Sequence, residues 1–412
     1  MFRANLLILT GAALVSACAA PREAPRSTSE PALNVADARC SDGAIAVDTA
    51  FPAGALASCE IRSDGRITIV LSPEDEPPIN CSAWYAFRVH SSAPRDVRIE
   101  LDYTACGHRY WPKTSTGDGV WTQLDPDRVK VFRRALPNGR EAESRSAMLS
   151  LTIGPEPIFV AAQEIFVPAT YDAWLDGVEN NPNVSRFELG RSAEGRLIEA
   201  ITIGNSQAKE QVVLVGRQHP PEVTGAFAML PFMETLMEDT ALATRFRERF
   251  LVTAVPMLNP DGVVRGFWRH NTGGVDLNRD WGPFTQPETQ LMRDMLAAME
   301  SNPEQELRVL LDFHSTNRDV FYTIPDELPT NPELFTRNWL ARYQDRMPGY
   351  EVDRDARHDP ARPISKGYSY EAFGIPAITF EIGDNTDREL IKRIGRESAI
   401  ALMEELLATP AS

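Results

Sequence analysis

The pattern of hydrophobic and polar positions changes once along the chain, which divides it into two regions. From about Cys40 to Pro168, short apolar runs alternate with polar residues and are separated by glycine, proline and aspartate. These runs are GRITIVLS, WYAFRVHSS, DVRIELDY, VKVFRRAL, AMLSLTIG and IFVAAQEIFV. Short strands at this spacing predict an antiparallel β-sandwich, which we assign to residues 39–168 as an accessory domain.

From about Tyr171 the rhythm changes to strands that alternate with longer helical stretches. The runs LIEAITIG, EQVVLVG, RFLVTAVPML, ELRVLLDF and PAITFEIG are rich in β-branched residues, as buried strands are. Between them, TGAFAMLPFMETLMED, PETQLMRDMLAAMES and PELFTRNWLARYQDRM carry apolar residues at helical spacing. This alternation predicts an α/β domain with a mixed central sheet over residues 171–408.

The chain begins with MFRANLLILTGAALVSAC, a charged start followed by an apolar run too short to span a membrane. Val15–Cys18 resembles the lipobox of bacterial lipoproteins, which implies a signal peptide at 1–17 and a diacylglycerol anchor on Cys18. A plain signal peptide cleaved nearby is the alternative. Residues 18–38 are rich in proline, alanine and serine and predict a flexible tether. Alanine after the cysteine resembles the signal for outer-membrane sorting, so we expect a periplasm-facing lipoprotein of a bacterial envelope.

Four further cysteines fall in the first quarter of the chain: Cys40, Cys59, Cys81 and Cys106. An even number in an exported protein predicts two disulfides, although four cysteines allow three pairings. We favour the sequential pairing, Cys40 with Cys59 and Cys81 with Cys106. A four-cysteine zinc site is the competing interpretation, but the spacing C-x₂-C is absent.

Composition indicates the class of protein more clearly than it indicates the function. The 412 residues are 43% hydrophobic and 24% charged, which is ordinary for a soluble globular protein. The net charge of −16 argues against nucleic-acid binding and leaves no basic patch for anionic lipid. Neither the substrate nor the oligomeric state follows from these values.

Candidate chemistry gathers where the predicted strands end. His219 follows VVLVG, His314 follows RVLLDF, and Glu381 lies in AITFEIGD. Ligands bind at the carboxyl ends of strands in open α/β sheets, so these residues can converge. With Glu222 in GRQHPPEVTG, the two histidines form the ligand set of a catalytic zinc that keeps one position open. The two prolines between His219 and Glu222 exclude a helix there and preset a turn.

The full set of motifs resembles the zinc carboxypeptidases of the carboxypeptidase A type. The motifs are His219-x-x-Glu222, NPDG at 259–262, Arg269, DLNRDW with Asn278 and Arg279, His314, and TFEIGD with Glu381. SAEGRLIEAITIG resembles the opening strands of that domain, and the match runs from about Tyr171 to Leu407. Within the family, WYAFRV and FVAAQEIFVPATYDAWL resemble the cytosolic carboxypeptidase branch with its N-terminal β domain.

The resemblance implies one zinc ion per chain, held by His219, Glu222 and His314, that acts as a Lewis acid and activates water. Glu381 would be the general base and Arg269 would stabilise the developing oxyanion. Asn278 and Arg279 would bind the free terminal carboxylate of a peptide substrate. For Arg279, the alternative is a salt bridge to Asp276 or Asp280.

Lys366 lies fifteen residues before Glu381, where the family places the residue that reads the terminal side chain. A cation there would favour an acidic residue; a solvated loop lysine is the alternative. The family's mobile tyrosine, about twenty-two residues before the base, is not carried over, because that position is Asp359. Tyr368 and Tyr370 lie nearer to the base, and we expect Tyr370 to be a packing residue. We expect none of the remaining histidines to bind metal: His90, His108, His270 and His358.

Three functions are consistent with these motifs. The leading hypothesis is an exported zinc carboxypeptidase that removes a C-terminal residue, with a possible preference for acidic ones. The second is a zinc deacylase of N-acyl amino acids that resembles the aspartoacylase and succinylglutamate desuccinylase group. The third is an inactive lipid-anchored binding protein, which the presence of every ligand and of the base disfavours.

Overall fold

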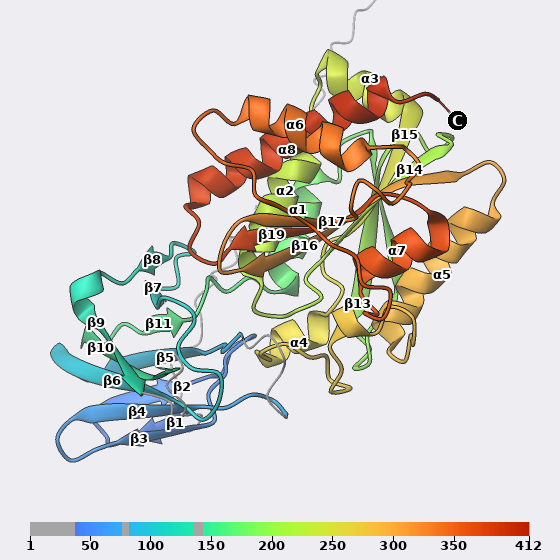
Figure 1. Ribbon diagram of the computed structural model, residues 1–412. Coiled ribbons are helices and arrows are strands. Elements are labelled where there is room, and N and C mark those ends of the chain that lie inside the picture. The colour runs from blue at the N-terminus through green and yellow to red at the C-terminus, as the bar shows by residue number, and fades with distance from the viewer. Residues whose placement is uncertain (1–37, 76–81, 135–142, 412) are drawn as a thin grey trace, which may run out of the picture. The chain divides into compact units, whose positions relative to one another are not determined.

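The computed structural model describes residues 38–75, 82–134 and 143–411 (Figure 1). The predicted signal peptide, lipidation site Cys18, tether and Cys81 therefore lie outside the described residues. Val35–Ser412 group into one compact unit.

The N-terminal region contains two β-sheets, as the short alternating runs predict. One has six strands in the order β1-β2-β5-β11-β7-β8 and the other has five in the order β3-β4-β6-β10-β9. The strands are β1 (Ala38–Ser41), β2 (Ile45–Asp48), β3 (Ser58–Ile61), β4 (Arg66–Leu71), β5 (Ala86–Ser91), β6 (Arg95–Tyr103), β7 (Lys113–Ser115), β8 (Thr122–Gln123), β9 (Val129–Arg134), β10 (Glu143–Ile153) and β11 (Ile158–Ala161), with a short 3₁₀ helix η2 (Pro126–Arg128) before β9.

Pairing in these two sheets is antiparallel with one exception. Strands β4 and β6 run parallel, with Ile67 beside Ile99 and Leu71 beside Tyr103. Alternation along a strand indicates which face of the strand is buried but not the direction of the neighbouring strand, so this parallel pair could not be predicted.

The predicted Cys40–Cys59 disulfide is present and joins β1 to β3 across the two sheets. Cys106 is also disulfide-bonded. Its predicted partner, Cys81, is outside the described residues, so that second pairing stays a prediction.

The C-terminal region is built on an eight-stranded mixed sheet in the order β12-β13-β15-β14-β16-β19-β17-β18. The four central strands, β15, β14, β16 and β19, are mutually parallel. Antiparallel pairs join β12 to β13, β13 to β15, and β17 to β19. The strands are β12 (Val184–Arg191), β13 (Leu197–Gly204), β14 (Glu210–Gly216), β15 (Phe250–Val255), β16 (Glu306–Thr316), β17 (Val320–Thr323), β18 (Arg354–Ala356) and β19 (Ala377–Gly383).

Helices cover both faces of this sheet (Figure 1). They are α1 (Pro168–Val178), α2 (Val223–Met237), α3 (Ala241–Arg249), α4 (Pro260–Arg265), α5 (Pro287–Ser301), α6 (Phe335–Arg346), α7 (Ser365–Phe373) and α8 (Arg388–Ala408), with a 3₁₀ turn η3 (Leu277–Arg279). Within the described residues, no helix combines the length and the apolar character that a membrane crossing requires.

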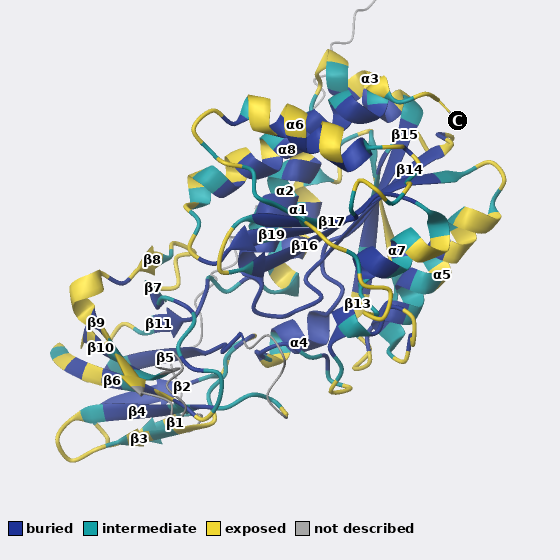
Figure 2. Cartoon of the chain, viewed as in Figure 1, coloured by how far each residue is buried: buried dark blue, intermediate teal, exposed yellow. Residues whose placement is uncertain are grey.

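The apolar core follows from the alternation along the central strands. Val212 and Leu214 of β14 pack on one face with side chains of α2, α6 and α8. Val213 and Val215 pack on the other face with side chains of α5. Because both faces are covered, β14 and β15 are buried along their whole length and β16 and β19 along most of theirs (Figure 2).

The core of the N-terminal sheets extends into the C-terminal region. The same apolar cluster contains Ile69 of β4 and Phe87 of β5, one from each sheet, and also Val223 of α2, Val263 of α4 and Trp268. The N-terminal region therefore packs directly on elements that border the strand ends.

Candidate active site

The stretch GRQHPPEVTG forms a tight non-helical turn between β14 and α2. The backbone N–H of Glu222 donates to the carbonyl of His219 at 3.3 Å, and the N–H of Val223 donates to that of Pro221 at 2.9 Å. Helix α2 begins at Val223, directly after Glu222. The turn therefore fixes Glu222 at the first turn of a buried helix and His219 at the end of a buried strand.

Gly225 allows this helix to approach the neighbouring strand closely. A Cβ at Gly225 would lie 2.6 Å from the carbonyl oxygen and 2.8 Å from the carbonyl carbon of His314 on β16. The backbone N–H of Gly225 and the hydroxyl of Thr224 meet Ser315 Oγ at 2.9 and 2.8 Å. Only glycine fits at this contact, which brings Glu222 beside His314.

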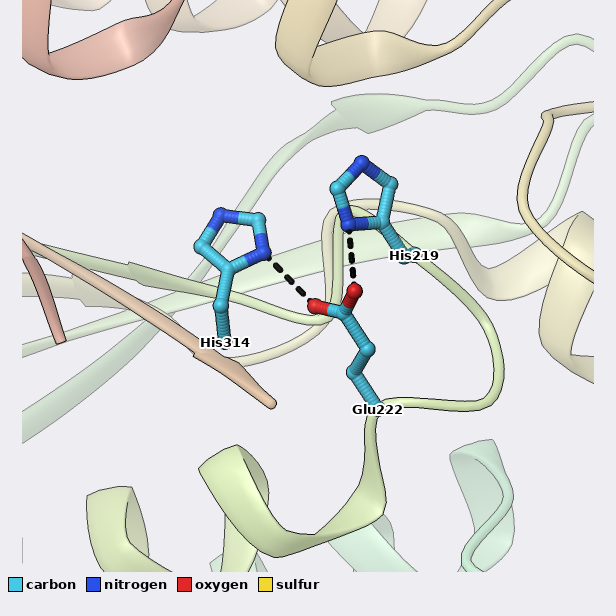
Figure 3. A group of neighbouring side chains, drawn as sticks. All are labelled: His219, Glu222 and His314. Atoms are coloured by element: carbon cyan, nitrogen blue, oxygen red, sulfur yellow. Dashed lines mark hydrogen bonds and ion pairs between the residues drawn. The ribbon is translucent and has the colours of Figure 1, made fainter. Parts of the chain in front are cut away.

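His219, Glu222 and His314 point toward one another, as Figure 3 shows. Glu222 Oε1 lies 2.9 Å from His219 Nδ1, and Glu222 Oε2 lies 2.7 Å from His314 Nδ1. All three side chains are buried, and one ligand atom from each lies within 4.8 Å of the others. Two imidazole nitrogens and a carboxylate in this arrangement can bind zinc.

The other ring nitrogen of each histidine is held by an aspartate. His219 Nε2 lies 2.9 Å from Asp276 Oδ1, and His314 Nε2 lies 2.8 Å from Asp312 Oδ2. Such carboxylate–imidazole pairs fix the ring orientation and leave Nδ1 directed at a metal. Asp312 is two residues before His314 on β16 and shares its face of the sheet.

Electrostatics of the buried triad fit a divalent cation. Three carboxylates, from Glu222, Asp276 and Asp312, surround two imidazoles, and burial of so much negative charge requires nearby positive charge. Although burial disfavours the charged forms, attraction to His219 and His314 holds the pKa of Glu222 well below its ordinary value. Attraction to Asp312 and Glu222 holds the pKa of His314 well above its own. A cation bound by the triad would supply the same compensation and leave both imidazoles neutral.

Glu381 lies beside the triad on β19, with its Cα paired to that of His314 in the parallel register. It lines the same cavity, and among the described residues its Oε2 is enclosed without a hydrogen-bond partner. Burial raises the pKa of Glu381 to about 8, and the negative charge of Glu222 acts in the same direction. An unpaired carboxylate beside a metal-ligand set is available for proton transfer.

Arg269 is buried next to the triad. Its Nε donates to Asp276 Oδ2 at 2.6 Å, and its Nη1 lies 3.8 Å from Glu222 Oε1. Glu74 of the N-terminal region accepts hydrogen bonds from the backbone N–H groups of 268, 269 and 270 at 2.7–3.0 Å. Glu74, which the sequence did not single out, thereby holds the backbone that carries Arg269.

Asn278 and Arg279 lie on the 3₁₀ turn η3 and line the cavity. Asn278 Oδ1 accepts a hydrogen bond from the backbone N–H of Ser365 at 2.9 Å, and its Nδ2 lies 3.3 Å from His314 Nε2. Arg279 Nη1 donates to the carbonyl of Asn278 at 2.6 Å, which directs the half-buried guanidinium into the cavity. Asp276 pairs with Arg269, and Asp280 accepts from residues 285, 286 and 289.

Lys366 is on helix α7, buried, and lines the cavity, so the solvated-loop alternative is wrong. Its ammonium donates to the carbonyl oxygens of Thr323, at 3.0 Å, and of Arg357. Burial lowers its pKa to about 8, against the attraction of Asp355.

The cavity encloses about 710 Å³ and is rich in cations. Six basic side chains reach its lining, which also carries the carboxylates of Glu222, Asp359 and Glu381; the six are Arg109, Arg269, Arg279, Arg357, Arg362 and Lys366. A local cationic surface in a chain of net charge −16 indicates a site for an anionic ligand.

Two lining residues were missed because nothing in their local sequence marks them. Tyr322 of β17 opens onto the cavity near Glu381, and burial together with the charge of Glu381 raises the pKa of its phenol. Arg109 comes from the N-terminal region, which contributed none of the motifs identified in the sequence. Asp312 could have been predicted as a partner of His314, because two residues separated by two positions on a predicted strand lie on the same face of the sheet.

Other histidines and tyrosines have partners outside the triad; among them, His270 forms with Glu74 and Asp75 a second group that could hold a metal ion. His270 Nδ1 is 2.8 Å from Asp75, and His108 Nδ1 is 2.9 Å from the hydroxyl of Tyr103. His358 lines the cavity, with its Nε2 2.6 Å from Glu371. Tyr370 packs against His358, and Tyr368 packs against Trp281 and Phe284.

A mixed α/β sheet with a two-histidine, one-carboxylate set at its strand ends is the arrangement of the metallocarboxypeptidase fold. The fold agrees with solved structures: a metallo-carboxypeptidase from Burkholderia cenocepacia superposes with a TM-score of 0.70 at 18% identity, over 88% of this chain and 99% of that one. The zinc carboxypeptidase profile, Peptidase_M14, matches residues 171–401. The chain therefore belongs to the zinc carboxypeptidase family.

Curated relatives include cytosolic carboxypeptidases. The mouse cytosolic carboxypeptidase 6 is 24% identical over 291 residues, which cover 66% of this chain and 53% of that protein. The human cytosolic carboxypeptidase 2 is 34% identical over 170 residues, which cover 37% of this chain and 19% of that protein. The chain thus spans about half the length of the first relative and a fifth of the second.

Proposed function

We propose that this protein is a zinc-dependent carboxypeptidase that binds one zinc ion and removes single C-terminal residues from peptides. The observation that carries the proposal is a shared cavity. Its lining combines the His219–Glu222–His314 triad, the carboxylate of Glu381, whose Oε2 has no hydrogen-bond partner among the described residues, and the side chains of Asn278 and Arg279. Zinc, when bound, supplies Lewis-acid activation and a nucleophile at neutral pH.

In this proposal the chain's own residues perform three tasks. Arg279 and Asn278 bind the terminal carboxylate and so restrict cleavage to the last peptide bond. Glu381 accepts the proton of the attacking water and returns it to the leaving amine. Arg269, fixed by Asp276, stabilises negative charge as it develops on the carbonyl oxygen.

A preference for acidic C-terminal residues is supported by the charge of the cavity. Lys366 is held by two carbonyls at the cavity wall, and Arg357 and Arg362 lie in the same lining. An acidic side chain would find compensating charge there, whereas a basic one would meet repulsion.

A matched set of substrates tests both parts of the proposal. The zinc-loaded protein is incubated with peptides that end in glutamate, glutamine or lysine, and with N-acetyl and N-succinyl amino acids. We expect release of glutamate to be about 10- to 100-fold faster, in kcat/KM, than release of the isosteric glutamine. Hydrolysis of the acyl amino acids alone would instead support a deacylase, and equal cleavage of all three peptides would remove the acidic preference.

We also propose that the protein is a lipoprotein of a bacterial envelope, anchored through Cys18. The lipobox-like Val15–Cys18 and the tether that follows support this. The expected result is detergent-phase partition of the full-length protein and loss of partition in Cys18→Ser. A wild-type protein that stays in the aqueous phase would contradict the anchor.

A further inference from the structure

We propose that the phenol hydroxyl of Tyr322 is a specificity-determining group of this site, which donates a hydrogen bond to the side-chain carboxylate of an acidic C-terminal residue. Tyr322 and Lys366 would then bind one oxygen each of that carboxylate. The inference rests on the proposed carboxypeptidase function, and it adds a second residue that selects the terminal side chain.

Tyr322 shares a face of the central sheet with Glu381. Strand β17 runs antiparallel to its neighbour β19, and the Cα of Tyr322 is paired with that of Thr379 (Figure 1). Paired residues carry their side chains on the same face of a sheet, and so do residues two apart on one strand. Thr379 and Glu381 are two apart on β19, so Tyr322 lies diagonally across from Glu381, and all three residues line the cavity.

The hydroxyl of Tyr322 is a donor that the protein does not use. Among the described residues, the phenol oxygen of Tyr322 makes no hydrogen bond, and the side chain is only partly buried. The hydroxyl of Tyr350, by contrast, donates to Asp319 at 3.0 Å. Because Tyr322 lines the cavity, its O–H is available to a ligand there.

Neighbouring charges hold the ring of Tyr322 in place. The Cζ of Arg357 lies over the ring, 5.7 Å from its centroid, which is within the range of a cation–π contact. Asp355 holds this guanidinium in turn, because its carboxylate accepts from Nε at 2.7 Å and also from Nη2. Asp355 is the Cα partner of Tyr322 on β18. The hydroxyl is therefore positioned before a ligand arrives, which lowers the entropy cost of binding.

Lys366 brings the cation of the site next to Tyr322. Its ammonium donates to the carbonyl of Thr323, the residue after Tyr322, at 3.0 Å and to the carbonyl of Arg357. An ammonium has three N–H donors, so one is left for a ligand. A carboxylate has two oxygens, and its burial is costly unless both are hydrogen-bonded. The remaining N–H of Lys366 binds one oxygen, and the hydroxyl of Tyr322 binds the other.

The test compares two peptides that differ in the terminal side chain, acetyl-Ala-Ala-Glu and acetyl-Ala-Ala-norvaline. Norvaline keeps the three side-chain carbons of glutamate and lacks the oxygens. The matched control is Tyr368→Phe, because Tyr368 packs against Trp281 and Phe284 and is not among the residues that line the cavity. Zinc content and thermal denaturation are checked for each variant before kcat/KM is measured.

We expect Tyr322→Phe to lose about 10- to 100-fold in kcat/KM on the glutamate peptide, because a hydrogen bond to a charged group is removed. On the norvaline peptide it should lose at most about 3-fold, and Tyr368→Phe should stay within about 3-fold on both. Titration of the two peptides into a Glu381→Gln background should show the same differences in Kd without turnover.

A double variant tests whether Tyr322 and Lys366 bind the same carboxylate. Lys366→Met removes the cation that draws the carboxylate into place, so adding Tyr322→Phe should then cost at most about 3-fold more on the glutamate peptide. An equal cost in both backgrounds would show that the two side chains act on different groups, which would overturn the proposal.

The remaining outcomes separate this inference from the proposed function. An equal loss on both peptides in Tyr322→Phe, or no loss on the glutamate peptide, would overturn the role of Tyr322 while leaving the carboxypeptidase proposal intact. A wild type that cleaves neither peptide would instead overturn the proposed function itself, and the role of Tyr322 with it.

Discussion

At the scale of single residues, two glutamates of the same cavity have opposite surroundings. Glu222 is held by both histidines, and this attraction outweighs burial and lowers its pKa. Glu381 has one enclosed oxygen without a partner among the described residues, and its pKa is raised. The carboxylate of Glu222, which is bonded to both imidazoles, suits a metal ligand. The carboxylate of Glu381, which has no such bond, suits a general base.

The separation of these roles predicts the behaviour of Glu381→Gln. The amide keeps the size of the side chain but cannot accept a proton, so we expect kcat to fall by about 10²- to 10⁴-fold or more. Zinc content and peptide Kd should stay within about 3-fold of wild type, measured by metal analysis and calorimetry. Glu222→Gln, the matched change at the ligand, should lose zinc. Turnover that survives in Glu381→Gln would refute the assignment of the base.

The contact between Asp312 and His314 Nε2 leads to a prediction about zinc affinity. Asp312→Asn removes the negative charge that orients His314 Nε2, and we expect zinc affinity to fall by about 10- to 100-fold. Ser365→Ala removes a different partner of the same carboxylate and should change zinc affinity less. Competition with a chelator measures both, and equal effects would show that Asp312 serves packing and not the histidine.

The lowered pKa of Lys366 predicts that the preference for a C-terminal glutamate depends on pH. Its pKa of about 8 means that the ammonium is charged below pH 8 and neutral above it, whereas the side chain of a C-terminal glutamate is ionised throughout pH 6–9. The ratio of kcat/KM for glutamate over glutamine should therefore be constant below about pH 7 and fall as the pH rises through 8. Asp355, Arg357 and Arg362 are the charges around this lysine. In Lys366→Met the ratio should be low and independent of pH; a ratio in that variant that still follows pH would assign the effect to another group.

At the scale of elements, the site depends on the contact between the first turn of α2 and strand β16. Gly225→Ala would place a methyl group 2.6 Å from the carbonyl of His314 and push the two elements apart. We expect the free energy of unfolding to fall by about 1–3 kcal/mol and zinc affinity to fall with it. Gly177 of α1 has open space around its Cβ position, so Gly177→Ala should instead stabilise by about 0.5–1 kcal/mol. Urea denaturation compares the two, and a Gly225→Ala protein as stable as wild type would contradict the close packing.

At the level of elements, the strands could be predicted from the sequence, whereas some strand pairings and side-chain partners could not. The strands that end close to His219, His314 and Glu381 were predictable, because long apolar runs lead up to these residues and parallel strands present their carboxyl ends together. The parallel pairing of β4 with β6 was not, since neighbours in a sheet are not encoded in the pattern of one strand. Side-chain partners such as Glu74 with the backbone of 268–270 depend on segments about 195 residues apart.

At the scale of the whole molecule, the N-terminal region contributes residues and contacts to the candidate site. It shares an apolar cluster with α2 and α4, it holds the backbone around Arg269 through Glu74, and it places Arg109 in the cavity. The pattern of hydrophobic and polar positions alone separated the chain into two regions. It could not show that they share the lining of one cavity, because Arg109 and Asp384 are 275 residues apart in the sequence.

We propose that this cavity cuts peptides only next to a free terminal carboxylate, with zinc as the required metal. The most direct measurement is mass spectrometry of one peptide in two forms, with a free and with an amidated C-terminus, after incubation with the protein. We expect loss of one C-terminal residue from the free acid only, abolition of this cleavage by a chelator, and its recovery with zinc. Equal cleavage of the amide, cleavage at internal bonds, or full activity in the chelator would contradict the account.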